Sequence, residues 1–440
     1  MKINEGNLLT TMILPALIEQ YQKITDFPSD VDPYSTTFQR NIKSPIHRWF
    51  PYKEGFSQSF VERIFSKFKV NKESRILDPF AGSGTILVEA KKKGIFSAGF
   101  ELNPFIYFLA EVKLNWDIDV NTLERTLNDL IRKLNFLKLT KKGSSRFIQA
   151  KKACTITPPE IKTLHKFYDE DTISRLTLIK DNWSNIENND IQNILKLVFS
   201  SLLVDMSNAS RSPSLGYKKS KIHKEKKVWE EFVNRLKIII TDLNWVQKNY
   251  LKGAGCYKLI KSDNRTSIEF IDDNFTHLIT SPPYINNIDY IRNTKLELFW
   301  CDFVKNSEEF YHLKKLFSRS FLGSVTDNAL VKVSPKIMDI AIKVREAKPF
   351  NKKVPAMITA YFKDMEATFS NIYKSLTEKA KLAIVVGDSC FAGVHIPTDI
   401  LICDIAESLG FIVNKIEISR FRRSTFHKTR LRESILYMEK

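Results

Sequence analysis

Two kinds of hydrophobic pattern divide the chain. Short apolar runs that end in a polar or turn residue indicate strands, and they occur within 75–90, 96–104, 256–263, 276–284, 381–389, 411–419 and 433–440. Between the second and third of these segments, apolar residues recur at helical spacing, as in Ile191, Ile194, Leu195, Val198 and Leu202. Residues 75–100 predict a β–α–β unit, with a strand, a small-residue turn, a helix and a second strand. Such a unit implies a parallel sheet.

We therefore expect an α/β fold, a doubly wound Rossmann-like sheet with a large helical insertion. Residues 1–110 are expected to hold an N-terminal segment and the first part of the sheet domain, 111–252 the insertion, and 253–440 the remainder. A further segment at 302–355 is basic and poorly periodic. The apolar positions Phe362, Met365, Phe369, Ile372 and Leu376 predict an amphipathic helix that packs on the core.

Composition adds a preference for acidic partners. The chain has 440 residues, of which 43% are hydrophobic and 27% charged, as in an ordinary folded protein. Lys and Arg number 68 against 50 Asp and Glu, so the formal charge is +18 and favours a polyanion as partner.

The cysteine pattern and the N-terminus favour a cytoplasmic protein without metal or membrane association. Five scattered cysteines (Cys154, Cys256, Cys301, Cys390 and Cys403) form no C-x-x-C pair and no cluster with metal-ligand spacing. The first 23 residues contain only a broken apolar run, which suits neither a spanning helix nor a signal peptide.

A turn of small residues follows the first predicted strand. The string DPFAGSGT occupies 78–85, where small residues let the backbone approach a ligand and a helix N-terminus offers free N–H groups. Asp78 disfavours a pyrophosphate and favours a cation, and Glu101 at the end of the next strand is placed to bind ribose hydroxyls. These residues favour the sulfonium cofactor S-adenosylmethionine over a dinucleotide. The alternative is a turn that only connects strand to helix.

A second loop, TSPPY at 280–284, follows the predicted strand THLI. Its two prolines fix φ and lack N–H donors, so the loop is rigid and presents acceptors. The Ser281 oxygen and the Pro282 carbonyl can bond both hydrogens of an exocyclic amine, which frees the nitrogen lone pair to attack a sulfonium methyl group. The Tyr284 ring offers a face on which a base stacks. The alternative is a structural Pro-Pro turn with a packing tyrosine.

With both loops present, the chain resembles the S-adenosylmethionine-dependent DNA amino-methyltransferases, which make N4-methylcytosine or N6-methyladenine. DPFAGSGT is similar to the cofactor loop of that family, TSPPY to its catalytic loop, and RWFPYKEGFS at 48–57 to the motif that closes over the methionine part. The resemblance covers about 40–110 and 255–440. It implies the catalytic residues Ser281, Pro282, Pro283 and Tyr284, and the cofactor-binding residues Tyr52, Asp78, Phe80, Gly82, Ser83, Gly84, Thr85, Glu101 and Asp263.

The resemblance also implies double-stranded DNA as substrate, a flipped base, and a setting in restriction–modification or defence with a partner restriction endonuclease. Serine before the two prolines is commoner among N4-cytosine enzymes, so N4 of cytosine is the preferred target. N6 of adenine, N2 of guanine in tRNA or rRNA, and a non-catalytic DNA-binding subunit stay open as alternatives.

Basic residues between the last two predicted strands are candidates for phosphate contact, together with a basic run in the insertion. The expected nucleic-acid-binding residues are Arg420, Arg422, Arg423, Lys428, Arg430, Lys218 and Lys219. Recognition of the DNA sequence is assigned to the insertion, to 302–355, or to both, and Arg211 is a further candidate for the cleft. For His47 and His427 we expect a surface or phosphate-contact role.

Overall fold

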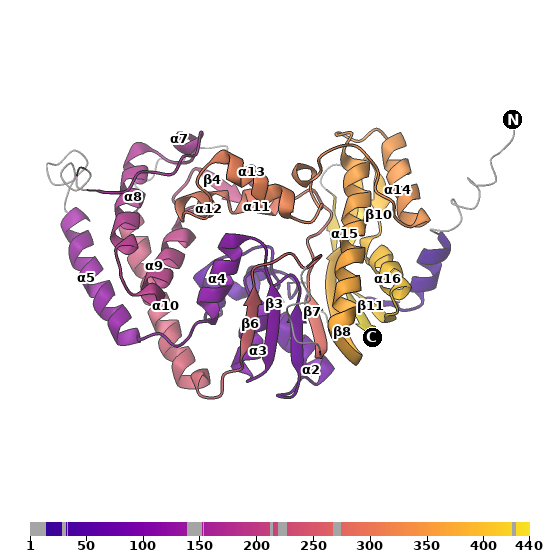
Figure 1. Ribbon diagram of the computed structural model, residues 1–440, viewed down its shortest axis with the longest axis horizontal. Coiled ribbons are helices and arrows are strands. Elements are labelled where there is room, and N and C mark those ends of the chain that lie inside the picture. Colours follow the sequence, from indigo (N-terminus) through magenta and orange to yellow (C-terminus); the bar gives the residue numbers. More distant parts are fainter. Residues whose placement is uncertain are drawn as a thin grey trace.

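The computed structural model describes residues 15–28, 32, 34–138, 152, 154–211, 214–218, 227–266, 274–424 and 428–440. Its centre is an eight-stranded sheet with the order β1-β11-β12-β8-β7-β2-β3-β6. The strands are β1 (Thr25–Asp26), β2 (Arg75–Asp78), β3 (Phe96–Phe100), β6 (Tyr257–Ile260), β7 (Phe275–Thr280), β8 (Leu376–Gly387), β11 (Ile412–Arg423) and β12 (Arg430–Glu439). Figure 1 shows this sheet in the middle of the molecule, with helices around it.

The strand order contains one reversal of direction, and the reversal locates the ligand crevice. From β2 the chain proceeds outward through β3 to β6, and from β7 it proceeds to the other side through β8, all in parallel pairing. The last strand, β12, is antiparallel to both β8 and β11. In such doubly wound sheets, ligands bind outside the carboxyl ends of the strands where the order reverses, which here is between β2 and β7. The expected fold class is confirmed.

Two hydrophobic cores lie on opposite faces of the sheet because neighbouring side chains of a strand point to opposite sides. Along β2, Ile76 belongs to one core and Leu77 to the other. The first core is covered by α2 (Gln58–Phe68), α3 (Thr85–Lys92) and α4 (Pro104–Leu114). The second is covered by α14 (Pro335–Glu346), α15 (Val354–Ser375) and α16 (Thr398–Ser408). Helix α15 contains four of the five predicted amphipathic residues, whereas Leu376 begins β8.

The described residues between β3 and β6 are mostly helical, as the spacing predicts. It contains α5 (Val120–Lys138), α7 (Leu164–Phe167), α8 (Glu170–Ser184), α9 (Asn189–Leu202), α10 (Val228–Val246), a π-helical turn (Gln247–Leu251), and the short hairpin of β4 (Ala209–Arg211) and β5 (Leu215–Tyr217). These helices lie beyond the β6 edge of the sheet (Figure 1). Their buried residues share one core with α4, so the insertion packs directly on the sheet domain.

Helices also cross above the carboxyl ends of the strands. They are α11 (Tyr290–Asn293), α12 (Lys295–Trp300) and α13 (Ser307–Leu316). The segment 302–355 therefore contains α13, a 3₁₀ turn (Leu322–Ser324), α14 and the first residues of α15. After β8, the short strands β9 (Ser389–Phe391) and β10 (Val394–Ile396) form a separate hairpin. Among the described residues, no helix combines the length and apolarity that crossing a bilayer requires.

Candidate active site

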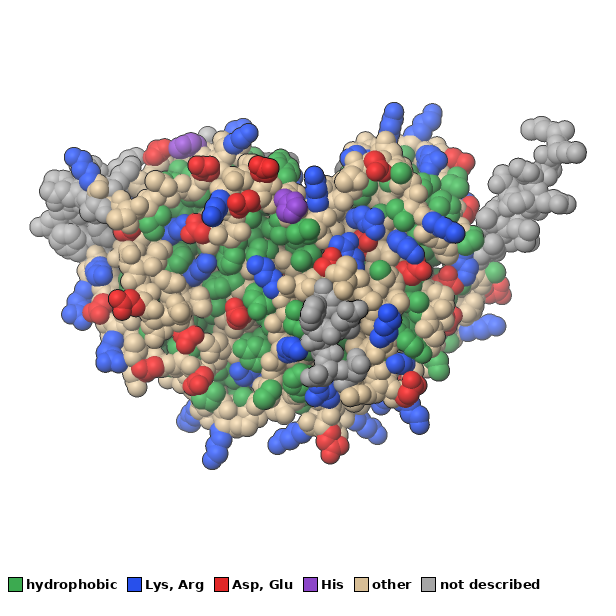
Figure 2. Space-filling view, in the orientation of Figure 1, with side chains coloured by type: hydrophobic (Ala, Val, Ile, Leu, Met, Phe, Trp, Pro, Cys, Tyr) green, Lys and Arg blue, Asp and Glu red, His purple; other side chains and the backbone are tan. Residues whose placement is uncertain are grey.

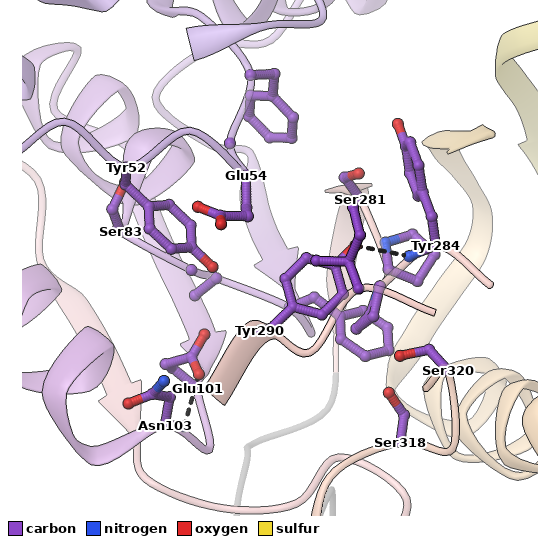
Figure 3. A pocket seen from close by; sticks show the side chains of 18 of the residues that line it. Tyr52, Glu54, Ser83, Glu101, Asn103, Ser281, Tyr284, Tyr290, Ser318 and Ser320 are labelled. Atoms are coloured by element: carbon purple, nitrogen blue, oxygen red, sulfur yellow. Dashed lines mark hydrogen bonds between the residues drawn. The ribbon is translucent and has the colours of Figure 1, made fainter. Parts of the chain in front are cut away.

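One cavity of about 480 Å³ lies at the switch point of the sheet, which is a size that suits a small-molecule cofactor. Its wall includes Phe80–Ser83 and Thr85 of the first loop, Ser281–Tyr284 of the second, and the tips of β3 and β6 through Glu101 and Asp263. Figure 3 shows the labelled side chains from these separate segments facing one space. The structure thus brings the two predicted loops together in a single pocket.

The first loop is closed by contacts that leave no room for larger residues. Gly82 has φ +51°, and a Cβ there would lie 3.2 Å from the Tyr52 ring. Gly84, at φ +76°, caps α3 and would meet Ala110 at 3.1 Å. The Tyr52 ring therefore lies directly on the backbone of the loop, and Tyr52 itself lines the pocket. A loop of this kind lets a ligand lie directly against backbone atoms.

Asp78 lies beneath the pocket and is not part of its wall. Its side chain is buried, and Oδ1 accepts hydrogen bonds from the Thr280 hydroxyl at 2.7 Å and from the Phe80 amide at 3.2 Å. Burial raises the pKa of Asp78 to about 7, against the opposing effect of these two hydrogen bonds. Because Thr280 precedes Ser281, Asp78 connects the cofactor loop to the catalytic loop.

The raised pKa of Asp78 predicts that the protein loses stability as pH rises. Between the ordinary pKa of 3.8 and about 7, the folded state holds a proton that the unfolded state has released. The free energy of unfolding should therefore fall as pH increases through this interval, and Asp78→Asn should flatten that slope. Thermal unfolding from pH 5 to 8 measures it, with exposed Asp327→Asn as the control. Equal slopes for the wild type and Asp78→Asn would contradict the assignment.

Carboxylates also lie at the tips of β3 and β6. Burial raises the pKa of Glu101 to about 7, although the backbone N–H of Asn103, at 2.7 Å from Oε1, opposes the shift. Asp263 forms an ion pair with Arg265 at 2.6 Å. The next residue, Asn264, donates to the Pro79 carbonyl at 2.5 Å, which fixes the tip of β6 against the cofactor loop.

The second loop is held so that its acceptors face the pocket. The Ser281 hydroxyl donates to the Val385 carbonyl at 3.2 Å, which leaves the lone pairs of its oxygen as acceptors. The backbone N–H of Tyr284 donates to the Tyr290 hydroxyl at 3.2 Å (Figure 3). Burial raises the pKa of Tyr290 to about 12, so its hydroxyl stays protonated near neutral pH. Tyr290 is a pocket residue that the sequence analysis missed, although it lies only six positions after Tyr284.

Two of the arginines expected to contact phosphate belong to the pocket wall. Register pairing places Arg420 opposite Glu433 in the β11–β12 hairpin, and the two form a bidentate ion pair at 3.0 and 2.8 Å. Arg422 Nε lies 3.4 Å from the same carboxylate, and its guanidinium lies 5.5 Å from the centre of the Tyr284 ring. Thr36 also donates to Glu433, at 2.6 Å. Arg420 and Arg422 thus face the interior of the cleft.

The remaining basic candidates lie outside this wall. Arg423, Lys428 and Arg430 are exposed, and the Arg430 guanidinium lies 3.4 Å from the centre of the Phe421 ring. Lys218 donates through Nζ to the Ser207 carbonyl at 3.4 Å, whereas Lys219 and His427 lie outside the described residues. Figure 2 shows Lys and Arg side chains mixed with carboxylates on the visible face, without one dense basic patch there.

The expectation for His47 is wrong. Its side chain is buried and bonds Glu89 at 2.7 Å, and burial lowers the pKa of His47 to about 4. Nothing in the local pattern marks this pair, because its members are 42 positions apart. His47 is therefore a buried core residue that holds α3 through Glu89, and it does not lie at the surface.

Arg211, which the sequence made a candidate for the cleft, and Glu54, which it did not single out, also line the pocket. Arg211, from β4 of the insertion, pairs with Glu297 and donates through Nε to the Asn293 carbonyl at 2.7 Å. Glu54 lies in the quoted string RWFPYKEGFS and accepts from Asn293 Nδ2 at 2.7 Å. Among the described residues, no group of three or more His, Cys, Asp or Glu side chains is arranged to hold a metal ion.

Comparison with known proteins shows which enzymes this chain is similar to. A family model described as DNA methylase, for N6 and N4 methyltransferases, matches residues 18–111, which include the cofactor loop and Glu101. Type II methyltransferase M.BsoBI of Geobacillus stearothermophilus is 26% identical over 92% of this chain and 87% of its own length. The chain is similar to DNA amino-methyltransferases over most of its length. Two further relatives of this chain are M.AvaI of Anabaena variabilis and M.MvaI of Kocuria varians, both also named Type II methyltransferases.

The relatives match this chain over most of its length. M.AvaI is 25% identical over 86% of this chain and 82% of its own length, and M.MvaI is 22% identical over 87% and 86%. The crystal structure of TrmN from Thermus thermophilus covers 92% of this chain and 53% of that chain at 9% identity, with a TM-score of 0.27 that supports no conclusion. The fold assignment therefore rests on the strand order described above.

Proposed function

We propose that this methyltransferase transfers a methyl group from S-adenosylmethionine to N4 of a cytosine flipped out of double-stranded DNA. The observation that carries the proposal is the division of charge within one pocket. At the end formed by the cofactor loop, the opposite charges cancel within the pair Asp263–Arg265 and within the pair Arg211–Glu297. Among the described residues, the carboxyl groups of Glu54 and Glu101 are left without an ion-pair partner at this end. At the other end, Arg420 and Arg422 share the single carboxylate of Glu433.

This division suits a cationic cofactor at one end and a nucleotide at the other. S-adenosylmethionine supplies an electrophilic methyl group when it is bound. Tyr52, Phe80, Gly82 and Ser83 would hold it, with Glu101 and Asp263 toward the nucleoside. Gly84 and Thr85 start the helix behind the loop, and Asp78 supports the loop from below.

The catalytic loop would prepare the amine for attack. Ser281 Oγ and the Pro282 carbonyl accept its two hydrogens, Pro283 keeps the loop rigid, and Tyr284 stacks on the base. With the cofactor bound, the amine nitrogen held by Ser281 and Pro282 would take the methyl group as the carbon–sulfur bond breaks, and would then release a proton to water. Cytosine presents two neighbouring acceptors, O2 and N3, that suit an arginine-lined wall better than adenine does.

The insertion at 111–252 and the segment 302–355 are proposed to read the DNA, and the exposed Arg423, Lys428 and Arg430 are proposed to contact phosphates. A restriction endonuclease with the same recognition sequence is the proposed biological partner, because the relatives are named Type II methyltransferases.

Incubation with labelled S-adenosylmethionine and either duplex DNA or tRNA tests the function. We expect label in DNA and N4-methylcytosine after nucleoside digestion. N6-methyladenine would overturn the choice of base, label in tRNA alone would favour an RNA guanine-N2 enzyme, and no transfer together with no cofactor binding would favour a non-catalytic subunit.

A further inference from the structure

Glu54 occupies a position in the pocket that differs from every other carboxylate there. It comes from the chain segment before α2, opposite the catalytic loop, and its carboxylate lies between the Tyr52 ring and Ser281 (Figure 3). The methionine part of the cofactor must pass through this space if its methyl group is to reach an amine held by Ser281. Glu101 and Asp263, in contrast, follow β3 and β6 on the nucleoside side.

The charge of Glu54 is not offset by an ion pair among the described residues. Its Oε1 accepts from Asn293 Nδ2 at 2.7 Å, which is a neutral donor. The nearby cation, Arg211, attracts Glu54 electrostatically, but its ion pair is with Glu297, whose side chain is 1% exposed. Lys53, the preceding residue, donates to the Arg211 carbonyl at 3.1 Å. A carboxylate in a partly enclosed pocket without its own cation favours a positively charged ligand.

Asp78 cannot serve in the same way, although the sequence favours it. Its oxygens are buried, one of them bonds Thr280 and Phe80, and the residue is absent from the pocket wall. We propose that Glu54, and not Asp78, is the carboxylate that offsets the positive charge at the methionine end of the cofactor. The inference rests on the proposed function, because it assumes a sulfonium cofactor in this pocket. Glu54 is thereby a positioning residue that selects the methyl donor over the product, which lacks the sulfonium charge.

Calorimetry with three ligands tests this role without reference to activity. S-adenosylmethionine carries a sulfonium and an ammonium group, S-adenosylhomocysteine only the ammonium group, and methylthioadenosine neither. Glu54→Gln should weaken the binding of S-adenosylmethionine by roughly 10- to 100-fold, because interactions with charged groups are the stronger ones. The affinity for S-adenosylhomocysteine should fall by less, and that for methylthioadenosine by about twofold or less. Glu54→Asp, which retains the charge, should recover part of the lost affinity.

The controls separate a charge effect from a structural one. Glu62→Gln removes the same charge from the exposed face of α2 and should leave all three affinities unchanged. An equal loss of affinity for all three ligands in Glu54→Gln, or no loss of affinity for any of them, would overturn the role of Glu54. If the wild-type protein bound none of the three ligands, the proposed function itself would fail. Thermal unfolding of each variant identifies a loss of folding.

Discussion

Replacement of Ser281 by alanine lowers the rate of methyl transfer by about 10- to 100-fold and leaves the affinity for S-adenosylhomocysteine unchanged. The factor corresponds to about 1.5–3 kcal/mol for a hydrogen bond in which charge develops. The serine oxygen is available because its proton is directed to the Val385 carbonyl at 3.2 Å. Single-turnover methylation of a duplex that contains the recognition sequence measures the effect.

Ser408→Ala provides a matched control for this variant. Ser408, at the end of α16, also donates to a backbone carbonyl, that of Ile405 at 2.7 Å, but does not line the pocket. It should leave the rate unchanged. An unchanged rate in Ser281→Ala would show that the serine oxygen does not bind the amine, whereas loss of cofactor affinity would place Ser281 in the cofactor site.

Substitution of Gly387 by alanine should impair methyl transfer almost as strongly, although the residue has no reactive group. Gly387 ends β8 and pairs with Glu433 of β12. An added Cβ would lie 2.8 Å from the Tyr284 ring and closer still to Arg422 Nη2. Since the ring is rigid, it must leave its position, and loss of base stacking costs about 1–3 kcal/mol. We expect a decrease of about 10- to 100-fold in single-turnover rate.

The double variant Gly387→Ala/Tyr284→Ala shows whether the glycine acts through the tyrosine. If it does, the double variant is no slower than Tyr284→Ala alone, because residues that act as one unit are not additive. Gly216→Ala is the control, since an added Cβ there meets only the Ser214 carbonyl at 3.8 Å. Fully additive losses would contradict the packing argument.

The position of the pocket was predictable because strand tips are local features. Asp78 and Thr280 each end an apolar run, and in a parallel sheet such ends lie along one edge. The strand order then makes β2 and β7 neighbours. The hairpin that contains Arg420 and Arg422 was likewise predicted, since it lies between two consecutive strands, and its register confirms it.

The partners of individual side chains were not predictable, because contacts between distant segments decide them. Asp78 was expected to contact the cofactor, but Thr280, which is 202 positions away, accounts for its buried carboxylate. Glu433 converts Arg420 from an expected phosphate contact into part of the pocket wall. Arg211 reaches the pocket only because β4 of the insertion lies against Glu297. None of these pairings has a spacing that a linear pattern reveals.

A crystal structure of the protein with S-adenosylhomocysteine is the measurement that decides whether both loops serve one reaction. The sulfur atom should lie between Tyr52 and Ser281, close to Glu54, with the adenine directed toward Asp263. A ligand whose sulfur lies outside this pocket, for example in the groove beside α13 that Tyr311 and Leu316 line, would contradict the assignment of the site.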